Sequence, residues 1–267
     1  MRRVTTTDLW HHYGRDRAER DRAVPDSFRW SWSQEDGPGP EVLGDLAGAT
    51  LADLGAGAAR HAAHLAVHHA PVRVDAVDAS PAQHAMATAL YGPLAPRLRL
   101  VHRDVVTHLR ANPGAYDVLY SVFGALDFTD PRELLPAAAS ALRPGGRLVF
   151  STLAHYLSGA PARPDVTAAD IPARDPDGES ATLRRWVLRE HVWTGVLVEA
   201  GFTAIRVEEL PAGGGGRAAA ALLIAAERPA APVPHGSHQG LHRSCIVPST
   251  AFQERAVDGR PGGGALG

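Results

Sequence analysis

Between Thr50 and Glu227 the chain alternates short, apolar runs rich in β-branched residues with longer segments of helical pattern. This alternation is typical of a parallel sheet with helices on both faces, because consecutive parallel strands need a crossover between them. We predict strands at 50–54, 72–77, 98–102, 116–122, 147–152, 182–188, 204–210 and 219–226, and helices at 58–69, 82–90, 131–142 and 190–200. The last two strands flank a glycine-rich turn and are predicted to form a hairpin. The predicted fold class is therefore α/β.

The composition excludes several kinds of active site. The 267 residues include 27 lysine or arginine residues, and all of them are arginine. Without lysine the chain lacks the phosphate-binding lysine of P-loop enzymes and the Schiff-base lysine of pyridoxal-phosphate enzymes. Its one cysteine, Cys245, excludes disulfide scaffolds and cysteine-rich metal sites. The net charge of −2 is unfavourable for a general nucleic-acid binder or a basic membrane-surface protein.

The apolar segments of the chain bear on its location. The first residues lack the apolar core of a signal peptide. The longest apolar stretch, 218–226, is much shorter than the ~20 residues that span a membrane. We therefore expect a soluble, cytoplasmic protein, monomeric or homodimeric, with no nucleic-acid or membrane partner.

The first predicted strand ends in a sequence that suits a nucleotide-containing cofactor. Asp53 is followed closely by Gly55-Ala56-Gly57, which opens the next helix. The two glycines let the backbone turn tightly and approach a ligand closely. Asp78 and Asp104 come at the ends of the second and third strands. Because open α/β sheets bind ligands at the carboxyl ends of their strands, we expect these groups to line one crevice.

Four motifs occur in order between residues 40 and 227. They are Asp53-Leu54-Gly55-Ala56-Gly57, Ala76-Val77-Asp78-Ala79-Ser80-Pro81, Tyr116-Asp117-Val118-Leu119 and Leu142-Arg143-Pro144-Gly145-Gly146-Arg147-Leu148. As a set they resemble the class I S-adenosylmethionine-dependent methyltransferases, and the stretch 121–126 is similar to small-molecule methyltransferases of actinobacteria. The resemblance implies a Rossmann-like, seven-stranded, mostly parallel sheet with an antiparallel last strand and helices on both faces. It also implies S-adenosyl-L-methionine as cofactor and S-adenosyl-L-homocysteine as product.

The resemblance assigns the crevice residues to parts of that cofactor. Residues 55–57 would pass the methionine moiety, and Asp53 would lie below its ammonium group. Asp78 would hold the ribose hydroxyls, and residues 104–105 would flank the adenine. The third glycine of the family's loop is Ala59 here. The expected cofactor-binding residues are Tyr13, Trp32, Asp53, Gly55, Ala56, Gly57, Asp78, Ala79, Asp104, Val105, Ser121 and Val122.

A nicotinamide dinucleotide is the competing interpretation of the glycine loop. Its Gly-x-Gly-x-x-Gly fingerprint needs a glycine three residues after Gly57, where this chain has Arg60. A catalytic Tyr-x-x-x-Lys for hydride transfer cannot be built without lysine. Both departures favour S-adenosylmethionine.

Methyl transfer from an activated donor mainly requires positioning, and a base is needed only when the nucleophile is still protonated. His155 and Tyr156 follow the fifth strand, and His155 is our first choice for a base because imidazole titrates near neutrality. A His155 that merely shapes the pocket is an equal alternative. Asp127, after the fourth strand, is predicted to orient a substrate amine or hydroxyl, with a turn residue as the alternative.

No metal is expected. We find no cluster of Asp and Asn residues of the kind that metal-assisted methyl transfer uses. His61, His64 and His68 fall on one stripe of the helix 58–69, and they lack the glutamate of a His-Glu-x-x-His zinc motif. We expect that stripe to be solvated.

The flanking segments are expected to close the crevice. In related enzymes an N-terminal helix covers the cofactor, so residues 1–45, which hold three of the five tryptophans, are predicted to be a helical lid. Residues 46–228 would form the methyltransferase domain, with the proline-rich stretch 157–185 as an insertion on the substrate side. Residues 229–267 are predicted to be a disordered tail.

The predicted function is methyl transfer to an O, N or C nucleophile of a small molecule, of the kind made in secondary metabolism. Two alternatives stay open. One is a methyltransferase-fold protein that binds the cofactor without transferring methyl, as a sensor or a cyclase-like helper. The other is a methyltransferase for RNA or protein.

Overall fold

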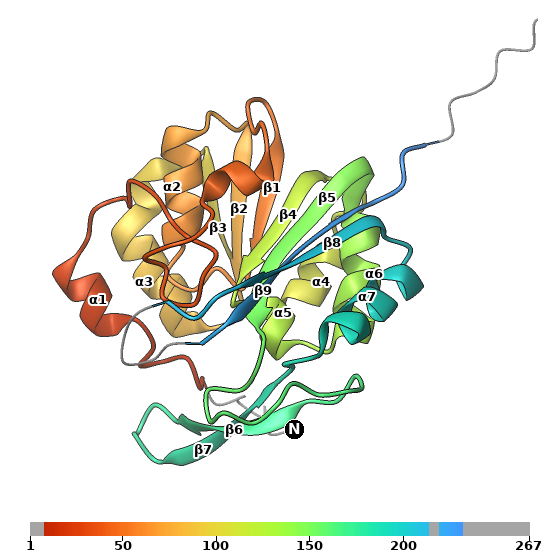
Figure 1. The fold of residues 1–267 in the computed structure, drawn as a ribbon. Helices are drawn as coiled ribbons and strands as arrows, with labels where there is room; N and C mark the ends of the chain where they lie inside the picture. The colour runs from red at the N-terminus through yellow and green to blue at the C-terminus, as the bar shows by residue number, and fades with distance from the viewer. Residues whose placement is uncertain (1–7, 214–218, 232–267) are drawn as a thin grey trace, which may run out of the picture. The chain divides into compact units, whose positions relative to one another are not determined.

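The computed structural model describes residues 8–213 and 219–231, so the expected tail lies outside the described residues beyond residue 231. Seven strands form one sheet in the order β3-β2-β1-β4-β5-β9-β8 (Figure 1). They are β1 Thr50–Leu54, β2 Arg73–Asp78, β3 Leu98–His102, β4 Tyr116–Val122, β5 Leu142–Leu153, β8 Thr203–Leu210 and β9 Ala221–Glu227. Strands β1 to β5 run parallel, whereas β9 is antiparallel to both β5 and β8. The predicted Rossmann-like sheet with an antiparallel last strand is confirmed.

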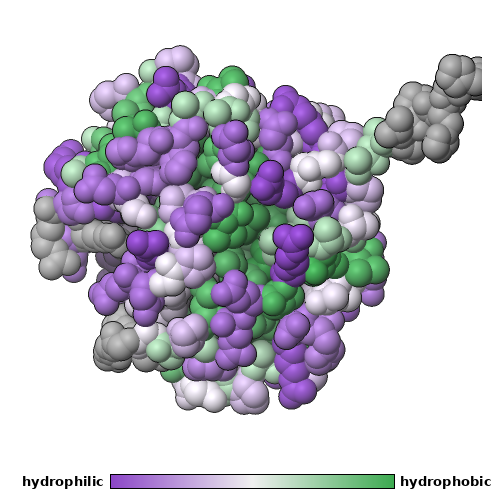
Figure 2. Space-filling view, turned by 45° about the horizontal axis from the view of Figure 1, so that its top comes forward, coloured by the Kyte–Doolittle hydropathy of each residue, from purple (hydrophilic) through white to green (hydrophobic). Residues whose placement is uncertain are grey.

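Helices cover both faces of this sheet (Figure 1). On one face, α2 (Arg60–His68) and α3 (Pro81–Tyr91) pack into an apolar core that also holds Leu51 and Trp30. On the other face, α4, α6 and α7 pack into a second core around Leu134 and Trp193. The remaining helical elements are α1 Arg15–Arg20, α4 Val105–Arg110, α5 Ala125–Phe128, α6 Pro131–Ala141, α7 Glu190–Glu199, and the 3-10 turns η1 Pro40–Leu43 and η2 Gly92–Leu94. On the face that Figure 2 presents, hydrophilic side chains surround a central strip of hydrophobic ones.

The parallel register brings the carboxyl ends of the central strands to one edge of the sheet. Asp53 of β1 pairs with Tyr120 of β4, and Asp78 of β2 pairs with His102 of β3. At the same edge α3 begins as predicted, because the Ser80 hydroxyl accepts a hydrogen bond from the Gln83 amide at 3.1 Å. The sequence signals for these strand ends and for the start of α3 therefore agree with the structure.

The proline-rich stretch 157–185 contains a hairpin. Strands β6 (Ala169–Arg174) and β7 (Ser180–Arg185) pair antiparallel in a separate two-stranded sheet. Pro172 is tolerated in β6 because each strand of such a pair has an unpaired edge. The predicted strand 182–188 accordingly begins and ends earlier than expected.

The N-terminal segment is helical only in part. Within residues 8–45, the part of this segment that the structure describes, the regular structure is α1 and η1, whereas the expectation was a helical lid over residues 1–45. Prolines at 25 and 38 interrupt any longer helix. The segment is nevertheless anchored, because the Phe28 and Trp30 side chains are buried in the core against α2. Tertiary burial of aromatic side chains therefore replaces helix formation here.

Ala59, which precedes α2, has a left-handed backbone conformation with φ +60° and ψ +25°, and it is fully buried. Such a conformation costs a non-glycine residue roughly 1 kcal/mol or more. We expect Ala59→Gly to raise the free energy of unfolding by about 0.5–1 kcal/mol, measured by urea denaturation. The matched control is Ala85→Gly within α3, where the same change should lower stability by about 1 kcal/mol. A destabilised Ala59→Gly variant would contradict the strain.

Candidate cofactor and active site

The loop after β1 is fastened to the end of β2. The amides of Gly55 and Ala56 donate to the Val77 carbonyl at 2.9 and 3.1 Å. The Gly57 amide donates to Asp78 Oδ2 at 2.7 Å. Both glycines have positive φ, +78° and +55°, which suits glycine far better than other residues. The loop thus holds a fixed curve beside the Asp78 carboxylate.

Gly55 is required by packing as well as by its φ. A Cβ on Gly55 would collide with the Ala125 amide nitrogen and lie 3.0 Å from the Gly124 carbonyl carbon. A Cβ on Gly124 would lie 2.6 Å from the Leu54 carbonyl oxygen. The loops after β1 and β4 therefore touch backbone to backbone, and the sequence predictions missed this role of Gly124.

The carboxylate of Asp78 is oriented by two backbone amides. Its Oδ2 accepts from Gly57, and its Oδ1 accepts from the Ser80 amide at 2.9 Å. Burial raises the pKa of Asp78, the two amide donors oppose that rise, and the nearby Asp8 carboxylate adds to it. Asp78 is therefore a half-buried acid at a strand end, and two backbone amides fix the orientation of its carboxylate.

The predicted adenine-flanking residues follow β3. Asp104 caps α4, since its Oδ1 accepts from the Thr107 amide at 2.8 Å, and its side chain is exposed. Val105 is buried, while Ala79, which follows β2, is exposed. The His102 ring bonds the Ala79 carbonyl at 3.1 Å and stacks on His84. The exposed Asp104 side chain thus uses its Oδ1 oxygen as a helix cap.

Asp53 is a buried acid with an incompletely bonded carboxylate. It is 2% exposed, and its Oδ2 has no hydrogen-bond partner within the part of the chain that the structure describes. Burial raises the pKa of Asp53 to about 8, the neighbouring Tyr120 hydroxyl opposes the rise, and Asp78 adds to it. Asp53 therefore keeps its proton to a higher pH than an ordinary aspartate does.

Asp53→Asn is our second testable substitution. Between its ordinary pKa of 3.8 and its folded pKa of about 8, Asp53 ionises in the unfolded chain but stays protonated in the folded one. Its contribution to the free energy of unfolding is therefore fully present below pH 4 and is lost as the pH rises towards 8. We expect urea denaturation at pH 5, 6.5 and 8 to show a shallower decline for Asp53→Asn than for the wild type. Equal slopes would contradict the raised pKa.

Asp127, a predicted substrate-orienting residue, lies in a buried ion pair. Its Oδ2 accepts from Arg185 Nε at 3.1 Å and Nη2 at 2.5 Å. Burial raises the pKa of Asp127, and Arg185 opposes the rise. The guanidinium of Arg185 lies 5.4 Å from the Trp32 ring centroid and 5.2 Å from that of Phe128. No local sequence pattern predicts this role of Arg185, which comes from β7, 58 residues later in the chain.

The predicted base, His155, has one nitrogen occupied. Its Nδ1 donates to the Tyr156 carbonyl at 3.0 Å, since a carbonyl can only accept, so the neutral ring keeps its lone pair on Nε2. The Tyr156 side chain is buried, and its hydroxyl donates to the Arg185 carbonyl at 3.4 Å. Tyr156 thus links the segment after β5 to the end of β7, while His155 is half-buried.

Two aromatic residues of the N-terminal segment contact aromatic residues that follow β4. The Trp32 ring meets Phe123 edge to face at 5.0 Å, and Phe123 has φ +49°, a strained conformation for an aromatic residue. Trp10 contacts Phe128 at 4.6 Å. Tyr13, a predicted cofactor contact, is 64% exposed. Trp32 therefore lies at the predicted site, whereas the Tyr13 side chain lies largely in solvent.

Two polar residues that the sequence predictions missed hold this segment in place. Asp8 Oδ2 accepts from the Ser80 hydroxyl at 2.9 Å and from the Ala82 amide at 3.1 Å. Gln83 Nε2 donates to the carbonyls of Trp10 and Tyr13 at 2.8 and 2.9 Å. Their partners lie about 70 residues away along the chain, which no local pattern reveals.

Ser121 and Val122 are the last two residues of β4. Ser121 is buried, and its hydroxyl donates to the Leu54 carbonyl at 2.7 Å, so it joins β4 to β1. Val122 is only partly buried.

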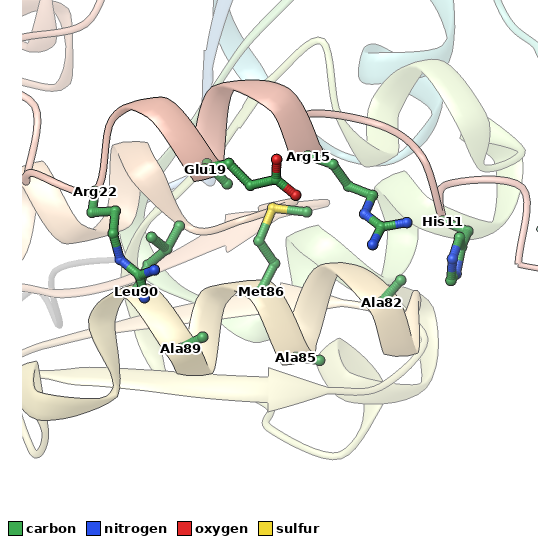
Figure 3. Close-up of a pocket in the computed structure, with 10 residues that line it drawn as sticks. His11, Arg15, Glu19, Arg22, Ala82, Ala85, Met86, Ala89 and Leu90 are labelled. Carbon is green, nitrogen blue, oxygen red and sulfur yellow. The ribbon is translucent and has the colours of Figure 1, made fainter.

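A groove of about 320 Å³ lies between α1 and α3 (Figure 3), lined by His11, Arg15, Ala18, Glu19, Arg22, Ala82, Ala85, Met86, Ala89 and Leu90. It contains none of the predicted site residues.

One expectation about the helix after the glycine loop is wrong. His64 was expected on a solvated stripe but is 2% exposed, because Pro25 and Phe28 of the N-terminal segment cover it. His68 is exposed, as expected.

Among the described residues no helix combines the length and apolar character needed to cross a membrane.

Comparison with known sequences identifies the central part of the chain. Residues 51–146 match the model of a family described as a methyltransferase domain. The ubiquinone biosynthesis O-methyltransferase of Pectobacterium carotovorum subsp. carotovorum (strain PC1) is 32% identical over 108 residues, which cover 40% of this chain and 44% of that enzyme. The chain therefore spans less than half the length of this curated relative.

Solved structures share the fold. An S-adenosylmethionine-dependent methyltransferase from Mesorhizobium loti aligns with a TM-score of 0.52 and 24% identity over 70% of this chain and 94% of its own. The [4+2]-cyclase SpnF aligns with a TM-score of 0.52 and 17% identity over 69% of this chain and 76% of its own. At these identities the likeness concerns the fold.

Proposed function

We propose that this chain is a class I S-adenosylmethionine-dependent methyltransferase that transfers the methyl group of its cofactor to a small molecule. The match of residues 51–146 to a methyltransferase domain and the fold shared with a solved methyltransferase support this proposal. One observation carries the proposal. The curved loop of Gly55 and Gly57 is bonded directly to the Asp78 carboxylate at the carboxyl edge of the sheet. That edge is where α/β sheets of this type bind nucleotides.

The residues present fit S-adenosylmethionine. Asp78 would accept from the ribose hydroxyls, and the free oxygen of Asp104 would accept from the adenine amino group beside Val105. The unpaired Oδ2 of Asp53, buried behind the glycine loop, suits the positively charged methionine end. Three carboxylates thus match the hydroxyl, amino and ammonium groups of the cofactor.

The cofactor supplies a sulfonium methyl group, which is already activated for displacement by a nucleophile. The chain's own residues then have to bring the acceptor atom into line and exclude water. Trp10 and Trp32 of the N-terminal segment would cover the crevice from one side. His155 Nε2 would accept the proton of a hydroxyl or amine acceptor.

We propose a phenolic hydroxyl as the first acceptor group to test, because the partial relative is named as an O-methyltransferase of ubiquinone biosynthesis. The aromatic rings of Trp32, Phe123 and Phe128 support a planar acceptor. The hairpin β6–β7 contributes Arg185 to the same place, which supports residues 157–185 as the acceptor-side insertion. A role in secondary metabolism and a cytoplasmic location remain parts of this proposal.

The alternative is a chain that binds the cofactor without transferring methyl. The fold it shares with the cyclase SpnF favours keeping this possibility, because one fold serves several chemistries.

Methyl-tritiated S-adenosylmethionine offered with a panel of catechols, hydroxybenzoates and small amines separates the two. The proposal expects labelled acceptor and an equal amount of S-adenosylhomocysteine. Cofactor binding with no labelled product across the panel would support the non-transferring alternative. No binding at all would contradict both.

A further inference from the structure

A buried histidine on α2 has one ring nitrogen fixed and the other available. His64 is covered by the N-terminal segment, and its Nδ1 lies 2.8 Å from the Pro25 carbonyl oxygen. Because a carbonyl only accepts, Nδ1 carries the proton and Nε2 keeps a lone pair. Metal-binding histidines are commonly oriented in this way, with the second nitrogen donating to a backbone carbonyl.

The available nitrogen of His64 faces a second imidazole. His64 Nε2 and His69 Nε2 lie 3.2 Å apart. Two bonds of about 2.0–2.1 Å to one ion, at a tetrahedral angle, place two nitrogens roughly 3.3 Å apart. The pair is therefore already close to the separation that a shared ion needs.

A third imidazole stands one helical turn from the first. The rings of His64 and His68 have centroids 4.9 Å apart, and His68 is exposed, so its side chain has room to turn. Among the described residues no three metal-binding side chains are already gathered at one point. Completing three ligands therefore needs a rotation of His68.

The charge around this histidine cluster, His64, His68 and His69, permits a cation. The groups that act electrostatically on His64 are His68, His69 and the Asp26 carboxylate, and Asp26 is the only anion among them in the described part of the chain. Neutral imidazoles are the form that binds metal.

We propose that the histidine cluster binds one divalent transition-metal ion of the borderline class, Zn²⁺, Ni²⁺ or Cu²⁺, for which imidazole is a preferred ligand. On binding, the His69 proton moves from Nε2 to Nδ1, and no other proton or electron is transferred. The ion replaces the hydrogen bond between the two rings. It thereby secures residues 25–28 against α2, apart from the crevice. This site departs from the sequence expectation of no metal.

Titration of the untagged, full-length chain with ZnCl₂ tests the proposal, using isothermal calorimetry at pH 7.5. Because His235, His238, His242 and Cys245 are further ligands in the sequence, the parent protein carries glutamine at the three histidines and serine at the cysteine. The parent is expected to bind one equivalent, and His69→Gln is expected to weaken binding at least tenfold. His84→Gln, in the stacked pair with His102, is the matched control and should bind as the parent does.

A second readout separates ligation from folding. Cu²⁺ bound to the parent should give an electron paramagnetic resonance spectrum with nitrogen splitting, and His69→Gln should lose it while keeping the parent's Tm without metal. The proposal is overturned if the parent binds no Zn²⁺, or if His69→Gln binds as tightly as the parent.

Discussion

Asp78→Ala is expected to weaken the binding of S-adenosylhomocysteine by about 100-fold or more. The substitution removes the proposed acceptor for two ribose hydroxyls, and hydrogen bonds to a charged group contribute about 1.5–3 kcal/mol each. A loss of about 3 kcal/mol corresponds to roughly 100-fold in Kd. It also releases the Gly57 amide, which Asp78 Oδ2 holds at 2.7 Å. Isothermal calorimetry measures the change directly.

The matched control for Asp78 is an aspartate at the opposite end of the strands. Asp117 accepts from the Thr50 amide at 2.8 Å and pairs with Arg143, so Asp117→Ala should lower the Tm without changing the affinity. Asp104→Ala, at the adenine end, should have an intermediate effect. If Asp78→Ala binds within about threefold of the wild type, the assignment of the ribose site is wrong.

Gly55→Ala is expected to lower the free energy of unfolding by about 3 kcal/mol. Of this, about 1 kcal/mol comes from φ +78°, and the rest comes from the collision of the new Cβ with the Ala125 backbone. A loss of that size is a large share of the stability of an ordinary domain, so the variant should also bind ligand poorly. Urea denaturation gives the free energy.

Gly145 separates the energetic cost of a positive φ from the cost of the Cβ collision. It has φ +80°, nearly the same as Gly55, but an added Cβ would meet nothing within 4 Å. Gly145→Ala should therefore cost only the backbone part, about 1 kcal/mol. Equal losses in the two variants would contradict the backbone contact between the loops after β1 and β4.

Local sequence signals predict the strand ends and helix starts at the carboxyl edge of the sheet for physical reasons. The Asp78–Pro81 segment ends a strand and caps a helix through contacts that span only a few residues. The glycine loop likewise owes its curve to its own φ angles and to the end of the next strand. The seven-stranded, mostly parallel sheet with an antiparallel strand near its end was expected only from the resemblance of the motif set to a known family, and the order of the strands was not predicted.

Contacts between distant segments could not be predicted in the same way. The Asp127–Arg185 ion pair spans 58 residues. The hydrogen bonds of Gln83 to the N-terminal segment span 70 and 73 residues. Helical periodicity placed His64 on the exposed stripe. The periodicity of one helix contains no information about the N-terminal segment, which packs over His64. Such residues are found only when the chain's tertiary packing is known.

We propose that the carboxyl edge of the sheet binds S-adenosylmethionine for methyl transfer. A crystal structure of the full chain grown with S-adenosylhomocysteine would show where the ligand binds. We expect the ribose hydroxyls on Asp78, the adenine beside Asp104 and Val105, and the amino group within reach of Asp53. Density for the ligand at any other place, such as the groove between α1 and α3, would contradict it.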